Sequence, residues 1–285
     1  MPSGTVISQA GVKEKAVGDH CTAKVLIDAQ TCASPRIYMR QETLTPSGKA
    51  GDRNYTSPFD VAYLAVAGQG VITVGSEQFA VEPEDLVFVP AETSHSLENQ
   101  LTDREFTYLS IFPLEPEWSA HIPVVTLGRV DEQGDEPKRG TFVKTKRVKG
   151  LSAGKAYTSK MVLDRTHSAS EKLQLNIGAV AAGHKLPCAV HRPPYDEAYY
   201  IIRGNGTVYM EATDGRDRHD IGPGDAVFIP GGTWHAVENA DTAKELVLLT
   251  IWAEHPDRGV NANYDRRLTE WGRTYVTIDE QFPDN

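Results

Sequence analysis

The chain has 285 residues, enough for one large or two ordinary domains, and its 40% hydrophobic and 24% charged residues are typical of a globular protein. A net charge of −10 argues against binding to nucleic acid or to an anionic membrane surface. The N-terminus lacks a secretory pattern, no apolar stretch could span a membrane, and the cysteines, Cys21, Cys32 and Cys188, form no CxxC pair, so we expect a cytoplasmic protein without a disulfide framework.

The first half of the chain alternates short β-type segments with turn formers. Strands are expected at 24–28, 36–44, 61–66, 71–74, 86–89 and 106–112. Segments rich in Gly, Pro and Asp separate these strands and predict tight turns. Short strands at this spacing are typical of an all-β sandwich or barrel.

The pattern is interrupted after residue 113. Three prolines follow, and 131–139 is charged without any apolar period, which indicates an exposed linker. Regular β patterning returns at 172–177. We therefore expect an N-terminal barrel with its arm at 1–125, a linker at 126–165, and a C-terminal barrel with its tail at 166–285.

The second half repeats the first. The Gly-x-Gly turn that begins at Gly204 matches the one at Gly68, at an offset of 136 residues. Further along, the offset is 140, and the matched residues are Pro90 with Pro230, His95 with His235, and Asn99 with Asn239. The additional residues fall in the expected hairpin at 211–220, so we interpret the chain as an internal duplication with one loop insertion.

A spaced motif identifies the family that the second half resembles. Gly224, Pro230, Gly232, His235 and Asn239 follow the order Gly-x5-Pro-x-Gly-x2-His-x3-Asn. This is the second motif of the cupin superfamily, and the resemblance is strong over 172–252 and weak over 36–112. It implies two tandem cupin-type barrels, each a double-stranded β-helix or jelly roll, in the arrangement called a bicupin.

The first cupin motif is present with one departure. His191, Glu197 and Gly204 match it, but Pro193 stands where a second histidine is usual. An alternative alignment places Ala189 at the first histidine and His191 at the second, with one extra residue before Glu197. Both alignments leave the same three candidate metal ligands, His191, Glu197 and His235.

The chemistry of these three residues fits a metal site. Residues six apart on an unbroken strand point to the same face, so His191 and Glu197 could both face inward, and His235 could converge on them from another strand. Two imidazoles and one carboxylate suit a divalent ion and leave coordination positions open. Fe(II) is favoured by this ligand set, with Mn(II), Ni(II) and Zn(II) as alternatives.

Other readings of this segment stay open. The loss of the second histidine could mark a site that no longer binds metal. His184 or Cys188 could instead supply a replacement ligand, although we expect His184 to face solvent and Cys188 to pack as a small apolar side chain.

The first half lacks most of these ligands. His95 and Asn99 are retained, but Glu84 and Glu92 replace the motif glycines, and Val61 stands at the position of Glu197. We therefore predict that the N-terminal barrel binds no metal.

Tyr195, Tyr199 and Tyr209 flank the candidate ligands and are candidate catalytic residues, because a tyrosine can shuttle a proton. The ligand set favours a dioxygenase-type enzyme acting on a small oxygenated substrate. A sugar or hydroxy-acid isomerase, epimerase or lyase is the first alternative, and a non-catalytic storage or ligand-binding bicupin is the second. The resemblance also implies a homodimer.

Overall fold

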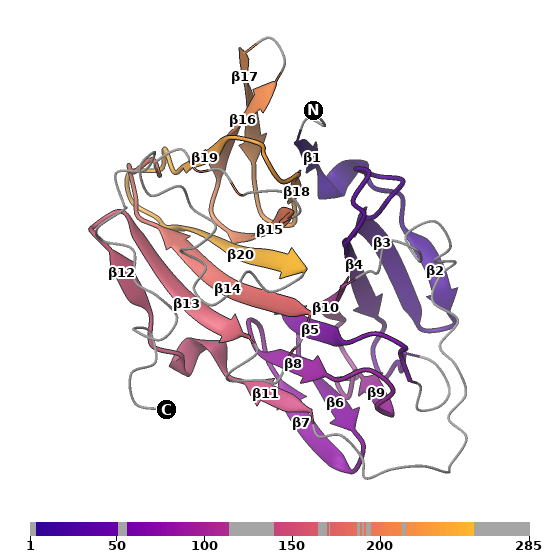
Figure 1. Ribbon diagram of the computed structural model, residues 1–285. Helices are drawn as coiled ribbons and strands as arrows, with labels where there is room; N and C mark the ends of the chain where they lie inside the picture. The colour runs from indigo at the N-terminus through magenta and orange to yellow at the C-terminus, as the bar shows by residue number, and fades with distance from the viewer. Residues whose placement is uncertain are drawn as a thin grey trace. The chain divides into compact units, whose positions relative to one another are not determined.

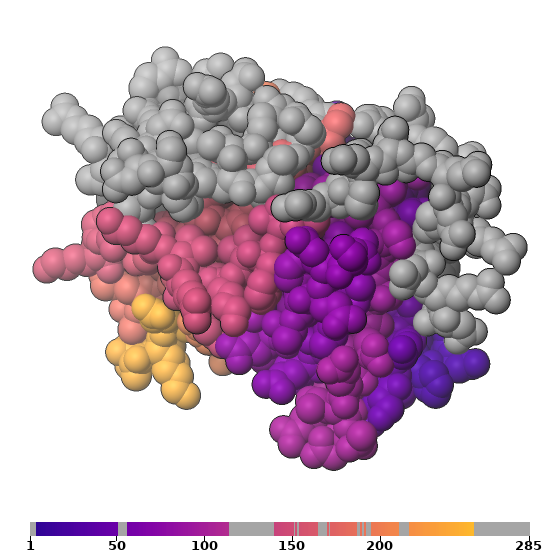
Figure 2. All heavy atoms as spheres, turned by 90° about the horizontal axis from the view of Figure 1, so that it is seen from below, coloured from indigo at the N-terminus to yellow at the C-terminus, as the bar shows by residue number. Residues whose placement is uncertain are grey.

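The structure is a computed structural model that describes residues 4–50, 56–113, 140–164, 170, 172–186, 189, 191, 195–212 and 215–253. Residues outside these ranges are grey in Figure 1 and Figure 2. The described residues form β-strands and two short 3-10 turns, η1 (Gln9–Gly11) and η2 (Thr145–Arg147), and include no α-helix. The predicted all-β fold class is confirmed.

The chain divides into two compact units. The N-terminal unit comprises Val12–Arg147 and Thr166–Leu173, and the C-terminal unit comprises Met1–Gly11, Val148–Arg165 and Gln174–Asn285. Each unit has one seven-stranded sheet and one three-stranded sheet, and the strand pairs within them are antiparallel.

In the N-terminal unit, the large sheet has the order β11-β8-β5-β10-β4-β3-β2 and the small sheet has the order β7-β6-β9. The strands are β2 (Lys15–Gly18), β3 (Cys21–Ile27), β4 (Ile37–Leu44), β5 (Val61–Ala67), β6 (Gly70–Val74), β7 (Glu77–Val81), β8 (Leu86–Val89), β9 (His95–Glu98), β10 (Phe106–Pro113) and β11 (Thr141–Val143).

In the C-terminal unit, the large sheet has the order β1-β18-β15-β20-β14-β13-β12 and the small sheet has the order β17-β16-β19. The strands are β1 (Thr5–Ile7), β12 (Leu151–Ala153), β13 (Tyr157–Leu163), β14 (Leu173–Val180), β15 (Glu197–Arg203), β16 (Gly206–Ala212), β17 (Gly215–Ile221), β18 (Ala226–Ile229), β19 (His235–Glu238) and β20 (Leu246–Ala253).

The two units repeat the same topology. The order β18-β15-β20-β14-β13 corresponds to β8-β5-β10-β4-β3, and the hairpin β16–β17 corresponds to β6–β7. β16 and β17 have seven residues each, whereas β6 and β7 have five each. The longer hairpin, visible in Figure 1, is the insertion that the change of offset predicted.

The strands that bear the site are covered on both faces. All eight residues of β20 are buried, as are the first five residues of β15, so burial in both strands is continuous rather than alternating. Inward-facing side chains of the C-terminal unit pack into one core cluster, in which the large residues include Tyr199, Ile201, Met210 and Leu248.

The motif glycines occupy left-handed backbone positions. Gly224 has φ 90° and Gly232 has φ 91°. In the N-terminal unit, the corresponding residues Glu84 and Glu92 keep positive φ angles of 76° and 61°. The turn geometry of the repeat is therefore preserved without glycine, at a cost of roughly 1–2 kcal/mol for each residue with a Cβ.

The compact units divide the chain differently from the ranges 1–125, 126–165 and 166–285 expected from sequence. β1 pairs with β18 of the C-terminal unit, with Val6 opposite Val227. β11 pairs with β8 of the N-terminal unit, and β12 and β13 belong to the C-terminal sheet, although all three lie in the expected linker. Three-residue segments such as β11 and β12 are too short to carry an apolar pattern, and pairing within a sheet makes them strands.

Two further expectations concern the termini and cysteines. Cys21 and Cys32 are not in disulfides, as expected, while Cys188 lies outside the described residues. The charged segment 131–139 also lies outside them. Within the described ranges, no helix combines the length and hydropathy that a membrane span requires.

Candidate metal centre

His235 is placed by the turn between β18 and β19. It is the first residue of β19 and lies opposite Met210 of β16. Its Nδ1 is 3.0 Å from the carbonyl oxygen of Thr233, and because a carbonyl oxygen only accepts, Nδ1 carries a proton. This bond fixes the ring so that Nε2 faces the interior of the unit.

His191 is placed by backbone bonds to the same turn. Ala189 and His235 exchange two backbone hydrogen bonds of 2.8 and 2.9 Å, and the Gly232 N–H donates to the His191 carbonyl at 2.7 Å. The prediction of one unbroken strand from His191 to Glu197 is wrong, because β15 begins only at Glu197. The side chains of His191 and Glu197 nevertheless meet, because the turn between β18 and β19 holds His191 and β15 holds Glu197.

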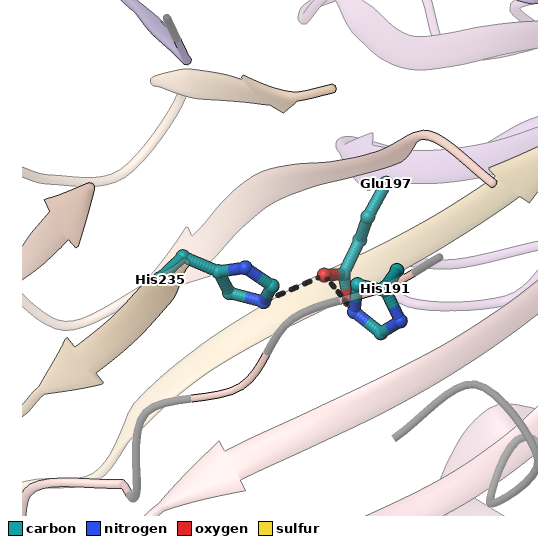
Figure 3. A group of neighbouring side chains, drawn as sticks. All are labelled: His191, Glu197 and His235. Carbon is teal, nitrogen blue, oxygen red and sulfur yellow. Dashed lines mark hydrogen bonds and ion pairs between the residues drawn. The ribbon is translucent and has the colours of Figure 1, made fainter. Parts of the chain in front are cut away.

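Glu197 is the point where the three side chains meet. It is the first residue of β15, lies opposite Ile229 of β18 and Trp252 of β20, and is 1% exposed. Its Oε2 is 2.8 Å from His191 Nε2 and 3.0 Å from His235 Nε2. Figure 3 shows both imidazole rings directed at this carboxylate.

The charges of the three groups depend on one another. Burial alone would raise the pKa of Glu197, but the charges and hydrogen bonds of His191 and His235 outweigh it and lower this pKa to about 2. Burial alone would lower the pKa of His235, but the hydrogen bond and charge of Glu197 outweigh it and raise this pKa. Glu197 is therefore an anion at neutral pH, as a metal ligand must be.

These three side chains could hold a divalent metal ion. Their ligand atoms all lie within 4.8 Å of one another, and all three residues are buried. Nitrogen and oxygen ligands about 2 Å from one ion lie roughly 3 Å apart, which is the size of the two Nε2–Oε2 distances. The Nδ1 bond of His235 also leaves its Nε2 lone pair as the free ligand in the neutral ring.

Of the three candidate tyrosines, Tyr199 contacts the triad formed by His191, Glu197 and His235. Its hydroxyl donates to Glu197 Oε2 at 3.1 Å, and its ring centroid is 6.2 Å from that of His235. Tyr199 lies two residues after Glu197 on β15, so both side chains point to the same face of the sheet. Tyr195 is half-buried in the segment before β15.

Tyr209 is not brought to the triad. It precedes Met210, whose side chain is in the core, so Tyr209 points to the opposite face of β16. There its hydroxyl donates to Glu238, and Lys185 Nζ lies 3.5 Å from the ring centroid.

His184 also lies apart from the three ligands. Its Nδ1 is 2.8 Å from the carbonyl oxygen of Ala182, in the turn where sequence placed it, and it is half-buried rather than fully exposed. Cys188, the other suggested replacement ligand, lies outside the described residues.

The sequence interpretation missed a row of polar side chains near the triad. These residues are buried on β14 and β20, where apolar residues surround them in sequence: Gln174, Asn176, Thr250 and Trp252. Gln174 and Asn176 alternate with leucine and isoleucine along β14, and this period-2 placement of amides was the available signal.

The corresponding histidine of the N-terminal unit has different partners. His95 Nε2 is 2.8 Å from the Tyr63 hydroxyl, and Nδ1 is 2.8 Å from the Thr93 carbonyl oxygen. Val61, which is fully buried, occupies the position of Glu197. Burial lowers the pKa of His95 to about 4, so this ring is neutral at pH 7.

Comparison with known proteins extends these observations. Residues 177–252 match the family model described as a cupin domain. The dimethylsulfoniopropionate lyase of Ruegeria pomeroyi is 33% identical over 84 residues, which are 30% of this chain and 38% of that protein. The chain thus spans well under two thirds of the length of this relative.

Solved structures of oxalate decarboxylases resemble the chain over most of its length. One is the Bacillus subtilis protein, described with Mn(II) centres, at a TM-score of 0.67 and 15% identity, covering 88% of this chain and 78% of that one. Another is a formate complex of the Lactobacillus farciminis protein, at a TM-score of 0.67 and 15% identity, covering 87% of this chain and 86% of that one. Residues 177–252 therefore match the cupin domain model, and the chain has an all-β jelly-roll fold like that of these structures.

Proposed function

We propose that the C-terminal unit is a metal-dependent enzyme of the lyase type that acts on a small oxygenated substrate. The observation that carries this proposal is the buried cluster of His191, Glu197 and His235 with the Tyr199 hydroxyl 3.1 Å from the carboxylate. A metal-ligand set and a proton-carrying hydroxyl in contact with it are the two components that elimination next to a carboxylate or carbonyl needs.

His191, Glu197 and His235 would hold the ion. When bound, a divalent ion supplies Lewis-acid polarisation of a substrate oxygen. The three side chains orient the site and are shielded from bulk water, since none is more than 3% exposed. Tyr199 holds a proton at its hydroxyl oxygen, within hydrogen-bond distance of Glu197. It would donate this proton to the carbon left with the electron pair when carbon dioxide departs, or to a leaving group that departs with that pair.

The similar proteins support this class of reaction. Their names describe a lyase and a decarboxylase, and one of them is described with Mn(II) centres. Both reactions break a bond within a small carboxylate. We extend the class, not the particular substrates, to this chain.

Metal content is the first test. Protein loaded separately with Mn(II), Fe(II) and Zn(II) under anaerobic conditions should retain about one ion per chain, measured by inductively coupled plasma mass spectrometry. His235→Ala and Glu197→Gln should lose most of this metal, because each substitution removes one of the three side chains that would hold the ion. A wild-type chain that retains no metal would favour the non-catalytic storage or ligand-binding alternative.

Tyr199→Phe is the second test. It removes the hydroxyl and keeps the ring, so metal content should be unchanged while turnover of a panel of small carboxylates falls by about 10²–10⁴-fold. Tyr209→Phe is the matched control, because Tyr209 lies in the same C-terminal unit but faces away from the triad. Turnover by this variant should equal that of wild type. Equal turnover in both variants would contradict the assigned role of Tyr199.

A dioxygenase is the second candidate. Two histidines and one carboxylate form the ligand set of non-haem Fe(II) oxygenases, and this is the observation that favours it. An oxygen electrode separates the candidates: a lyase forms product without consuming oxygen, whereas a dioxygenase consumes oxygen in proportion to product. A metal-free N-terminal barrel, a homodimer and a cytoplasmic location stay predictions.

A further inference from the structure

We propose that Gln174, Asn176 and Trp252 form a substrate-binding subsite beside the metal triad, and that its ligand is a short carboxylic acid that carries a hydroxyl group. This inference rests on the proposed function for the identity of the reacting site. It adds the chemical class of the substrate and the residues that select it.

Trp252 belongs to the same interior face as the triad. It is the cross-strand partner of Glu197 between β20 and β15, so the two side chains stand on one face of the sheet. Its ring lies in a T-shaped arrangement with His191, at a centroid distance of 6.1 Å. Trp252 is 2% exposed.

The amides of β14 face the same interior. β14 is the other neighbour of β20 in the sheet. In the N-terminal unit, the corresponding strands β4 and β10 align Tyr38 with Phe112 and Arg40 with Ser110. By the offsets of the repeat, these pairs correspond to Gln174 with Trp252 and to Asn176 with Thr250.

Contacts within the C-terminal unit agree with this placement. Asn176 Nδ2 donates to Ser159 Oγ at 2.8 Å, and the Tyr157 hydroxyl hydrogen-bonds with Ser159, Asn176 and Thr250. The charge of Glu197 also contributes to raising the pKa of Tyr157, so this polar group lies close to the triad.

Three polar atoms of this row have no hydrogen-bond partner among the described residues: Trp252 Nε1, Gln174 Nε2 and Asn176 Oδ1. Their side chains belong to residues that are only 2–4% exposed. A buried donor or acceptor left unpaired costs roughly 1–3 kcal/mol, so three in one row indicate a group that completes them.

The chemistry of the three atoms defines that group. Two N–H donors suit the two oxygens of a carboxylate, and one amide oxygen suits a hydroxyl that donates a hydrogen bond. The subsite itself carries no cation. A divalent ion with one ligating carboxylate leaves a net positive charge nearby, which favours an anionic ligand over a neutral one.

In the N-terminal unit, charged side chains that pair with each other occupy the corresponding positions. Arg40 stands at the position of Asn176 and Glu42 at the position of Gly178, with 3.0 Å between Arg40 Nε and Glu42 Oε2. Ser110 also donates to Glu42. An internal ion pair thus fills the space that, in the C-terminal unit, is lined by neutral amides.

The experiment measures binding of L-lactate and propionate to the Zn(II)-loaded chain by isothermal titration calorimetry. Trp252→Phe and Gln174→Met each remove one donor and keep most of the volume, and both should weaken both acids about tenfold or more. Asn176→Leu should weaken lactate about tenfold and leave propionate unchanged. Zinc content should stay at the wild-type level in all three variants.

Tyr38→Phe is the matched control, because Tyr38 occupies the position of Gln174 in the other unit, and it should bind both acids as wild type does. A measurement on the wild-type chain avoids the question of folding. The indole N–H signal of Trp252 in a ¹⁵N-correlated spectrum should move downfield on addition of propionate, as expected for a new hydrogen bond to an anion. An unmoved signal at saturating propionate would overturn the proposal.

Glu197→Gln separates this proposal from the function of the triad. The substitution removes the negative charge, so propionate should bind the metal-free variant, and Trp252→Phe in that background should weaken it about tenfold. If the wild-type chain retains no metal and propionate still binds in a Trp252-dependent way, the subsite stands and the lyase fails. If the chain binds metal and turns over substrate, but Trp252→Phe and Gln174→Met leave both affinities unchanged, the proposed function stands and the subsite fails.

Discussion

Val61 and Glu197 occupy equivalent positions, and the histidines of the two units differ in their partners and in the direction of their pKa shifts. His95 Nε2 lies 2.8 Å from the Tyr63 hydroxyl, and burial lowers the pKa of His95 to about 4. His235 faces Glu197, and the carboxylate raises its pKa in spite of burial. The carboxylate that stands in place of a valine thus gives the histidine of the C-terminal unit an anionic partner and makes it a candidate metal ligand.

The lowered pKa of His95 predicts an acid weakness of the N-terminal unit. The unfolded chain takes up this proton near pH 6.5 and the folded unit only near pH 4, so stability is full above about 6.5 and falls as the pH drops toward 4. The loss should approach about 3 kcal/mol. Urea unfolding of wild type and His95→Gln between pH 7 and 4.5 measures it.

His95→Gln cannot take up a proton, so its stability should depend less on pH over this interval. Parallel stability curves for the two proteins would contradict the assignment, because the loss would then come from other groups.

At the residue scale, the three candidate ligands could be predicted from sequence, whereas the side chains around them could not. His191, Glu197 and His235 were identified because spacing in a motif survives in sequence. Tyr209 was a candidate because it is near the ligands in sequence, but the alternation of β16 turns it outward. Gln174 and Trp252 are 78 positions apart in sequence and lie on strands that are neighbours only in the sheet, so no spacing rule links them.

At the scale of elements, β1 stands out because it completes the edge of the C-terminal sheet. Three residues pair with β18, Val6 packs against the core, and the Gln9 N–H donates to Asp225 Oδ1 at 3.1 Å. Gly4 lies so close to the core that a Cβ there would be 2.2 Å from Met210 Sδ. The arm therefore covers the β18 edge, which would otherwise offer unpaired backbone groups.

Deletion of residues 1–11 should destabilise the C-terminal unit by about 2–4 kcal/mol, because it removes the burial of two branched apolar side chains and re-exposes a strand edge. The urea midpoint of that unit and amide exchange at β18 measure the effect. Gln9→Ala is the milder control: its backbone N–H still donates to Asp225, so little should change. An unshifted midpoint after the deletion would show that β1 adds no stability.

The sequence alone places residues 1–11 with an N-terminal barrel, because a three-residue segment carries too little pattern to identify the strand it pairs with. Longer strands were predictable: 61–66, 86–89 and 106–112 correspond to β5, β8 and β10. Edge strands are defined by the sheet they join, which pattern reading within one segment does not reveal.

At the scale of the molecule, each unit has its own core, and among the described residues the candidate metal-ligand cluster is in only one of them. A bound metal should therefore stabilise the C-terminal unit selectively. At a free ion concentration 100 times the dissociation constant, the gain is about 2.7 kcal/mol. Calorimetric unfolding with and without Zn(II) should show one component shift and the other stay in place.

His235→Ala supplies the control for this prediction, since the shift should vanish while the other component is unchanged. A shift of both components to the same extent would mean that the two units unfold as one cooperative block. The duplication itself was predictable, because repeated Gly, Pro, His and Asn positions identify it at the scale of the whole chain.

The pairing of β1 with β18 also orders events during synthesis. Gln9 and its partner Asp225 are separated by 216 residues. At about 5–20 residues per second, a ribosome needs roughly ten to forty seconds to produce that interval. β1 is thus made well before its partner, and it can join the C-terminal sheet only after β18 has been synthesised.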